Sequence, residues 1–202
     1  MQISLLTNGL QPEKMIENVD VFAEKLLVLA EDIGISLSGL TADHIALRIN
    51  DSELAKQAHT AWLKYGEQIS CAQINGRPII VVRFYEPIRV KSWQIECLEL
   101  PYPAEGKRYP EEGWEHIEFV IPSTAESAEG YLDSLKKQFP LMAERWSGLA
   151  DKGIKTKLSS PKGEGERLPN PTVAFKRDGV CIKLHPHTLK KVVESERAEE
   201  DR

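Results

Sequence analysis

The sequence is poor in cysteine, in long apolar runs and in positive charge, and each scarcity excludes a class of protein. No stretch approaches about 18 uncharged apolar residues, and the N-terminus lacks a positive region followed by an apolar one. We therefore expect a cytoplasmic protein with neither a transmembrane helix nor a secretory signal. The cysteines are odd in number, widely spaced and without a C-x-x-C pair, which predicts buried free thiols in a reducing compartment: Cys71, Cys97 and Cys181.

Charge and composition narrow the range of partners. Lysine and arginine number 26 against 31 aspartate and glutamate, a formal charge of −5, and no basic block or basic stripe with interleaved aromatics is present. Binding to nucleic acid or to an anionic membrane is therefore not expected. With 41% apolar and 28% charged residues, a chain of 202 residues can bury a core as one domain or as two small modules.

The chain begins with a predicted amphipathic helix over residues 12–33. Its apolar residues recur at spacings of three and four, and Gly34 follows as a typical C-terminal cap. We interpret residues 1–40 as an N-terminal helical extension that packs on the rest of the chain.

Residues 41–105 are predicted to form a first βαβββ module. The opening strand alternates between apolar and polar side chains, as a half-buried strand does. Asp51 is a suitable N-cap for the helix that follows, and Asn75-Gly76 is a dipeptide favoured in tight hairpins. The four strands are predicted at residues 43–49, 69–74, 77–85 and 93–100.

Residues 106–187 repeat this order as a second βαβββ module. Ser123 and Glu126 have the spacing of a capping box that opens a helix, and Asp178-Gly179 marks a hairpin. Its strands are predicted at residues 115–121, 154–158, 172–177 and 180–185. Residues 188–202 are predicted to be a C-terminal helix and tail.

The opening strands of the two modules also share letters, which indicates an internal duplication. The corresponding segments are Asp43-His44-Ile45-Ala46-Leu47 and Glu115-His116-Ile117-Glu118-Phe119. We therefore predict an α+β fold in which two βαβββ modules form a curved, half-open mixed β-sheet barrel, with helices outside.

The polar faces of the predicted strands carry an unusual set of side chains that would converge inside such a barrel. The first and last strands of each module supply the candidate ligands for one divalent metal ion: His44, Glu99, His116 and His185. Imidazole nitrogen and carboxylate oxygen suit zinc, nickel, cobalt, manganese or iron, and a third histidine favours the first three.

Each candidate has a plainer interpretation. A histidine on a polar strand face is more often a surface or hydrogen-bonded residue than a ligand, although equivalent positions in two repeats favour a ligand role. Glu99 could be an exposed strand-end carboxylate with Glu96 as its rival, and His185 could simply end the last strand. Cys97 and Cys181 are expected only to line the cavity.

Other charged residues form a second group of candidates. We expect Arg48, Lys183 and Lys162 to anchor the substrate and Glu118 to move a proton during catalysis. The alternative for the strand residues is a salt-bridged wall of the cavity. The loop over residues 160–167, which contains Lys162, is a candidate lid.

Several strings in the sequence resemble the bacterial YecM family. They are Thr41-Ala42-Asp43-His44-Ile45, Asn75-Gly76-Arg77-Pro78-Ile79, Glu99-Leu100-Pro101, Lys107-Arg108-Tyr109-Pro110, Gly113-Trp114-Glu115-His116-Ile117-Glu118, Ser160-Pro161-Lys162-Gly163-Glu164, Glu166-Arg167-Leu168-Pro169-Asn170-Pro171 and His185-Pro186. That family resembles the vicinal oxygen chelate superfamily, in which paired βαβββ modules enclose a divalent metal. The resemblance implies His44, Glu99 and His116 as ligands, with His185 where the superfamily usually has glutamate.

The leading hypothesis is a metal-dependent enzyme whose ion chelates two adjacent oxygens of a small substrate and stabilises an enolate-like or oxyanionic intermediate. Isomerase or lyase chemistry is preferred, and a non-haem iron dioxygenase is the enzymatic alternative. The rivals are a non-catalytic small-molecule-binding module and a metal-free remnant closed by salt bridges. We expect a monomer or a homodimer.

Overall fold

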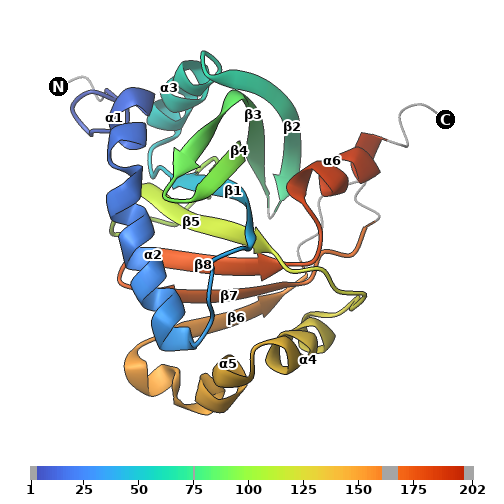
Figure 1. The fold of residues 1–202 in the computed structure, drawn as a ribbon. Helices are drawn as coiled ribbons and strands as arrows, with labels where there is room; N and C mark the ends of the chain where they lie inside the picture. The colour runs from blue at the N-terminus through green and yellow to red at the C-terminus, as the bar shows by residue number, and fades with distance from the viewer. Residues whose placement is uncertain (1–3, 75, 161–167, 198–202) are drawn as a thin grey trace.

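The computed structural model describes residues 4–74, 76–160 and 168–197, and its centre is one mixed sheet of eight strands (Figure 1). The strand order is β2-β3-β4-β1-β5-β8-β7-β6. The strands are β1 (Thr41–Arg48), β2 (Gly66–Ile74), β3 (Arg77–Val90), β4 (Trp93–Pro101), β5 (Gly113–Val120), β6 (Lys155–Ser159), β7 (Thr172–Arg177) and β8 (Val180–His185). The α-helices are α1 (Pro12–Glu17), α2 (Val19–Ile33), α3 (Ser52–Trp62), α4 (Ala128–Gln138), α5 (Pro140–Arg145) and α6 (Leu189–Arg197).

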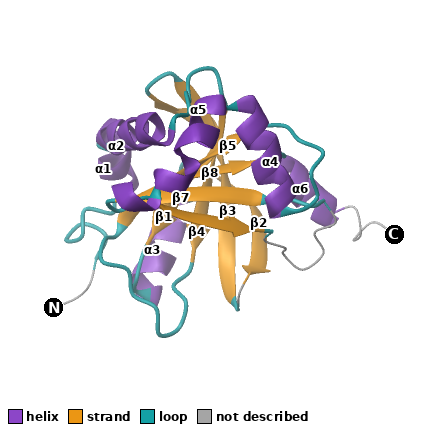
Figure 2. Cartoon of the chain, turned by 90° about the horizontal axis from the view of Figure 1, so that it is seen from below, coloured by secondary structure: helices purple, strands orange, loops and turns teal. Residues whose placement is uncertain are grey.

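The strand order confirms two βαβββ modules. The first runs β1, α3, β2, β3, β4 and the second β5, α4, β6, β7, β8, and in each the opening strand lies parallel to the last. The opening strands β1 and β5 pair with each other, antiparallel, in the middle of the sheet. The sheet curves without closing and the helices lie outside it (Figure 2), as the sequence predicts. The exact module boundaries stay a prediction, because one continuous sheet joins the two.

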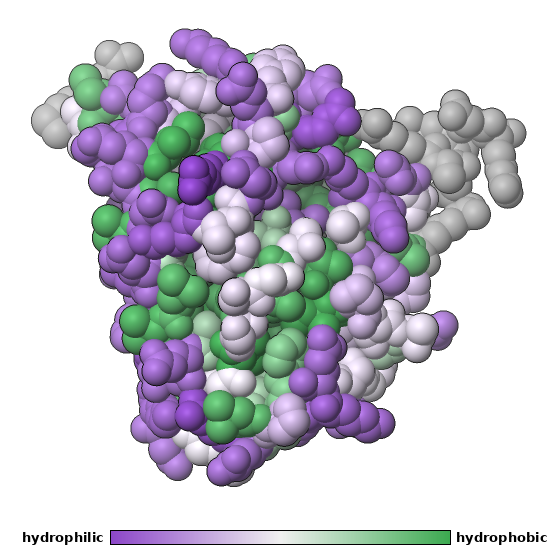
Figure 3. Space-filling view, viewed as in Figure 1, coloured by the Kyte–Doolittle hydropathy of each residue, from purple (hydrophilic) through white to green (hydrophobic). Residues whose placement is uncertain are grey.

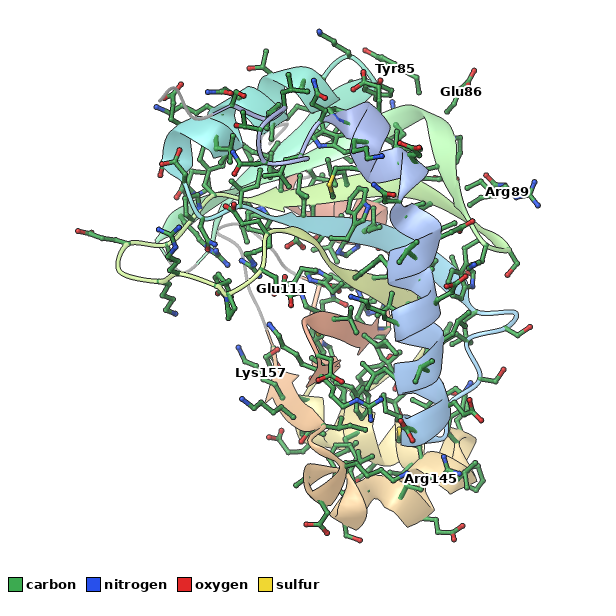
Figure 4. All side chains as sticks on the ribbon, turned by 90° about the vertical axis from the view of Figure 1, so that its left-hand side faces the viewer. Tyr85, Glu86, Arg89, Glu111, Arg145 and Lys157 are labelled. Carbon is green, nitrogen blue, oxygen red and sulfur yellow. The ribbon has the colours of Figure 1, made fainter. Side chains whose placement is uncertain are left out.

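The predicted N-terminal helix is two helices that meet at Asn18. Asn18 leaves the helical conformation, with φ −99° and ψ 3°, and its Nδ2 donates to the carbonyl oxygen of Lys14, 3.0 Å away. Gly34 ends α2 in the left-handed conformation, as expected. Helix α2 packs against strands of both modules, β3 and β8. At the C-terminal end of α2, the carbonyls of Glu31 and Asp32 accept from the guanidinium of Arg145, which lies on α5 (Figure 4).

The helix of the second module begins later than the sequence predicts. Ser123 and Glu126 do not form a capping box, because Ser123 Oγ instead accepts from the amide of Ala125 within the preceding turn. Ser127 is the N-cap, and its Oγ accepts from the amide of Gly130 at 3.1 Å. In the first module the prediction is confirmed, since Asp51 caps α3 by accepting from the amide of Leu54.

The two faces of the sheet differ in polarity, which decides where chemistry can take place. The central strands turn fully buried apolar side chains toward the helices: Ile45, Leu47, Ile117 and Phe119. Seen in the direction of Figure 1, the molecular surface has apolar residues gathered near its middle and polar residues around them (Figure 3). The alternate positions of β1 and β5 carry the histidines on the opposite face.

Two further predictions meet the structure here. Cys97 and Cys181 are buried free thiols, but Cys71 is exposed because it lies on the edge strand β2. Among the described residues, the helices are all too short or too polar to cross a bilayer.

Candidate metal site

The pairing of β1 with β5 brings His44 and His116 together. His44 lies opposite Glu118, and His116 lies opposite Ala46. The two imidazole rings are 6.1 Å apart between centroids, and each residue is only 1% exposed. The Nε2 atoms of both rings are buried without a hydrogen-bond partner. A buried polar atom without a partner is costly, so this pair requires an explanation.

Two carboxylates complete a group of four, which we call the His/Glu group: His44, Glu99, His116 and Glu118. Glu99 reaches it from β4, whose parallel pairing with β1 sets Glu99 beside Ala46. One ligand atom from each of the four residues lies within 4.8 Å of all the others. Glu118 Oε1 is 3.3 Å from His44 Nε2 and 3.2 Å from His116 Nε2, and Glu99 Oε2 is 3.4 Å from His44 Nε2.

These separations fit ligands around a common ion. Four ligands at about 2.0–2.1 Å from a tetrahedral ion are about 3.3 Å from one another. Hydrogen bonds between nitrogen and a carboxylate are usually shorter, about 2.7–2.9 Å. These three distances between a histidine nitrogen and a carboxylate oxygen therefore match the edges of a coordination polyhedron better than direct hydrogen bonds.

The fourth symmetric position is occupied by Lys183. Glu118 pairs with Lys183 between β5 and β8, as Ala46 pairs with Glu99 between β1 and β4. Lys183 is therefore the counterpart of Glu99, and the correspondence of His185 with Glu99 inferred from the sequence is wrong, because His185 lies two residues further along β8. Lys183 Nζ donates to Glu118 Oε1 at 2.7 Å. A permanent cation thus stands beside the His/Glu group.

His185 belongs to a neighbouring cluster and not to the His/Glu group. Its Nε2 is 3.7 Å from Asp43 Oδ2, and its Nδ1 is 3.3 Å from Asn170 Nδ2 and 3.7 Å from Glu118 Oε2. With Asp43 and His44 it forms a second set of three metal-capable residues. Of the four ligands predicted from the sequence, the structure brings His44, Glu99 and His116 together.

The electrostatics of the His/Glu group favour ionised carboxylates. Burial raises the pKa of Glu118, but the Lys183 ammonium and the two imidazoles outweigh burial and hold that pKa well below its usual value. Burial also raises the pKa of Glu99, but Lys183 and the two imidazoles outweigh burial and lower that pKa to about 2. Burial lowers the pKa of His44, yet the neighbouring carboxylates, Glu118 first, raise it well above its usual value. The group therefore attracts positive charge.

The other predicted residues take different places. Arg48 is buried, with its guanidinium paired to Glu115 and 4.2 Å above the ring of Tyr109. Glu96, the rival of Glu99, pairs with Lys190 at the surface. Lys162 and most of the predicted lid lie outside the described residues.

Sequence reasoning missed two carboxylates that contact the histidines. Asp43 Oδ2 lies 2.9 Å from His44 Nδ1, and Glu115 Oε2 lies 2.9 Å from His116 Nδ1. The available signal was the acid-histidine pair repeated at the start of both modules. Strict alternation along a strand argued against a contact between neighbouring residues, because alternation places their side chains on opposite faces of the sheet.

Comparison with known proteins settles the family. The family model described as "YecM protein" matches residues 11–196. The chain belongs to the YecM family. Protein YecM of Escherichia coli K12 is 41% identical over 177 residues, 88% of this chain and 89% of that protein. An uncharacterized protein of Haemophilus influenzae is 35% identical over 85% of this chain and 87% of its own length.

One solved structure agrees with this assignment. A structure titled "Structural Genomics, Protein EC4020" has a TM-score of 0.76 and 36% identity to this YecM-family chain, and the match covers 93% of each. A methylmalonyl-CoA epimerase from Mycobacterium tuberculosis has a TM-score of 0.38 and 13% identity over 72% of this chain and 86% of that one. A likeness at that level carries no argument about activity.

Proposed function

We propose that this YecM-family protein binds one divalent metal ion in the His/Glu group and acts as a vicinal-oxygen-chelate-type enzyme on a small oxygen-bearing substrate. One observation carries the proposal: the unpartnered Nε2 atoms of His44 and His116 both face the same carboxylate oxygen of Glu118. Two such nitrogens with two ionised carboxylates are a donor set that zinc, nickel, cobalt, manganese and iron accept.

The nearby thiols do not belong to this donor set. Burial raises the pKa of Cys97 to about 11 and that of Cys181 to about 12, so both stay protonated near neutral pH. A thiol must lose its proton to bind a metal well. We therefore assign the two cysteines to the wall of the site.

A bound divalent ion supplies Lewis-acid stabilisation of negative charge on substrate oxygens. Lys183 adds a second positive charge, and 26% of its side chain is exposed, which leaves it able to touch an anionic substrate oxygen. We propose that Glu118 acts mainly as a ligand, because a carboxylate with so low a pKa is a weak base near neutral pH. Arg48 supports the site from behind through Glu115.

A non-haem iron dioxygenase is the second candidate. The sequence-based preference for isomerase or lyase chemistry depended on His185 as a third histidine ligand. The His/Glu group instead contains two histidines and two carboxylates, and two histidines with one carboxylate are the ligands of many iron(II) oxygenases. The identity of the bound metal separates these readings.

The test is metal analysis of the purified protein followed by metal removal. We expect about one equivalent of a divalent metal per chain. Restoring the ion at 100 times its dissociation constant should stabilise the chelator-treated protein by about 2.7 kcal/mol. For a chain of this length that is a rise of about 5–10 °C in Tm. The proposal is contradicted if the protein is purified without metal and none of the five ions changes its unfolding temperature. Two alternatives would then remain: a metal-free remnant closed by salt bridges, and a small-molecule-binding module that needs no metal.

A further inference from the structure

Each histidine of the His/Glu group is backed by the carboxylate of the residue before it. Asp43 Oδ2 and Glu115 Oε2 each lie 2.9 Å from the Nδ1 of the following histidine. The Asp43 and Glu115 side chains are only 8% and 12% exposed. The far nitrogen of each ring, Nε2, is the one that faces the group.

Two β-bulges make this arrangement possible. Between Ala42 and His44, strand β1 advances two residues while β5 advances one, so Asp43 is the extra residue. The shift at the other end of the same pairing makes Glu115 the extra residue, this time on β5. A bulge re-aims a side chain that regular alternation would send to the other face. The duplicated modules thus carry one bulge each, at corresponding positions.

Each carboxylate also has at least one further partner. The oxygen of Asp43 that contacts His44 accepts from the backbone amide of Leu189, the first residue of α6, at 2.8 Å. The oxygen of Glu115 that contacts His116 pairs with Arg48, and Lys176 Nζ lies 3.6 Å from the other oxygen. These additional donors keep each carboxylate an acceptor and limit its rotation.

We infer that Asp43 and Glu115 are positioning residues that hold the hydrogen of His44 and His116 on Nδ1 and leave both Nε2 lone pairs directed into the His/Glu group. Their link to a metal rests on the proposed function, whereas the placement of the hydrogens does not. Loss of a residue that hydrogen-bonds to a metal-binding histidine typically lowers metal affinity about 10–100-fold. Through Leu189, the C-terminal helix α6 takes part in orienting His44.

The experiment combines nitrogen-15 NMR of the histidine rings with zinc titration. The spectra of chelator-treated wild-type protein are recorded at an alkaline pH, because the neighbouring carboxylates raise the pKa of His44 well above its usual value. Once both rings are neutral, we expect hydrogen on Nδ1 and none on Nε2 for His44 and His116. Asp43→Asn should change the position of the ring hydrogen at His44 alone, and Glu115→Gln should change it at His116 alone. An amide, unlike a carboxylate, can present an N–H donor to Nδ1, and Nδ1 then has to accept instead of carrying the hydrogen. Each variant should bind zinc about 10–100-fold more weakly than wild type.

Glu67→Gln is the matched control, since Glu67 is an acidic residue of the edge strand β2 with a half-exposed side chain whose partner is Arg83. It should leave both the ring spectra and zinc affinity unchanged. Hydrogen on Nε2 in the wild-type rings overturns the inference without any variant, as do variants that keep the wild-type spectra and affinity. If the spectra follow the inference but wild type binds no zinc, the positioning role stands and the proposed metal function fails.

Discussion

The His44→Ala/His116→Ala double variant should bind zinc more than about 100-fold more weakly than wild type. Loss of a residue that merely hydrogen-bonds to a ligand lowers affinity about 10–100-fold, and this variant removes two direct ligands of the proposed site. Two carboxylates remain in the His/Glu group, which suit magnesium or calcium better than zinc. Competition against a chromophoric chelator measures the change.

Two other histidines provide the control for this experiment. His59 lies on α3, where its Nδ1 is 3.2 Å from the hydroxyl of Tyr102, and His187 lies beyond the end of β8. His59→Ala/His187→Ala therefore removes the same number of imidazoles without touching the site, and zinc affinity should stay within about twofold of wild type. Equal loss in both double variants contradicts the assignment. Thermal unfolding confirms beforehand that each variant is folded.

Lys183→Met should destabilise the metal-free protein by about 2–3 kcal/mol. The substitution keeps an unbranched side chain of similar length but leaves Glu118 and Glu99 without their main positive neighbour. Removing one partner of a buried ion pair costs about 3–5 kcal/mol, and the 26% exposure of the Lys183 side chain places this case somewhat lower. The corresponding fall in Tm is about 5–10 °C for a chain of this size.

Zinc should offset more of the loss in Lys183→Met than it adds to wild type, because a divalent ion replaces the missing positive charge. Lys190→Met is the control, since the Lys190–Glu96 pair is about half exposed and such pairs contribute about 0–1 kcal/mol. Differential scanning calorimetry of both variants with and without zinc decides the matter. A Lys183→Met protein that is no less stable than Lys190→Met shows that the ammonium does not balance the buried carboxylates.

Much of the fold could be predicted because alternation, caps and turn residues are local signals. Both opening strands and the Asp178-Gly179 hairpin are where the sequence places them. The turn between β3 and β4 has no such local signal. Lys91 adopts a positive φ of 52° there, a conformation that usually belongs to glycine, asparagine or aspartate and that a lysine does not indicate. Contacts with α2 hold it there: its amide donates to Asp20, and its ammonium pairs with Glu24. A pattern of neighbouring residues cannot predict this turn, because Asp20 and Glu24 are far from Lys91 in the sequence.

The candidate site was predicted in part for the same reason. The equivalent positions of His44 and His116 in the two repeated opening strands identified both residues, and the central strand pairing brings them together. The roles of Asp43 and Glu115 depend on bulges, and a bulge is a property of two paired strands and not of one. Lys183 was placed among substrate-binding residues, but its correspondence with Glu99 emerges only from the register of β8 against β5.

The most direct test of the central claim is the anomalous diffraction of a zinc-loaded crystal. We expect one strong peak about 2.0–2.1 Å from Nε2 of both His44 and His116, with a carboxylate oxygen of Glu99 or Glu118 completing the coordination. A structure with zinc bound elsewhere, or with these two Nε2 atoms free of metal at saturating zinc, contradicts the account.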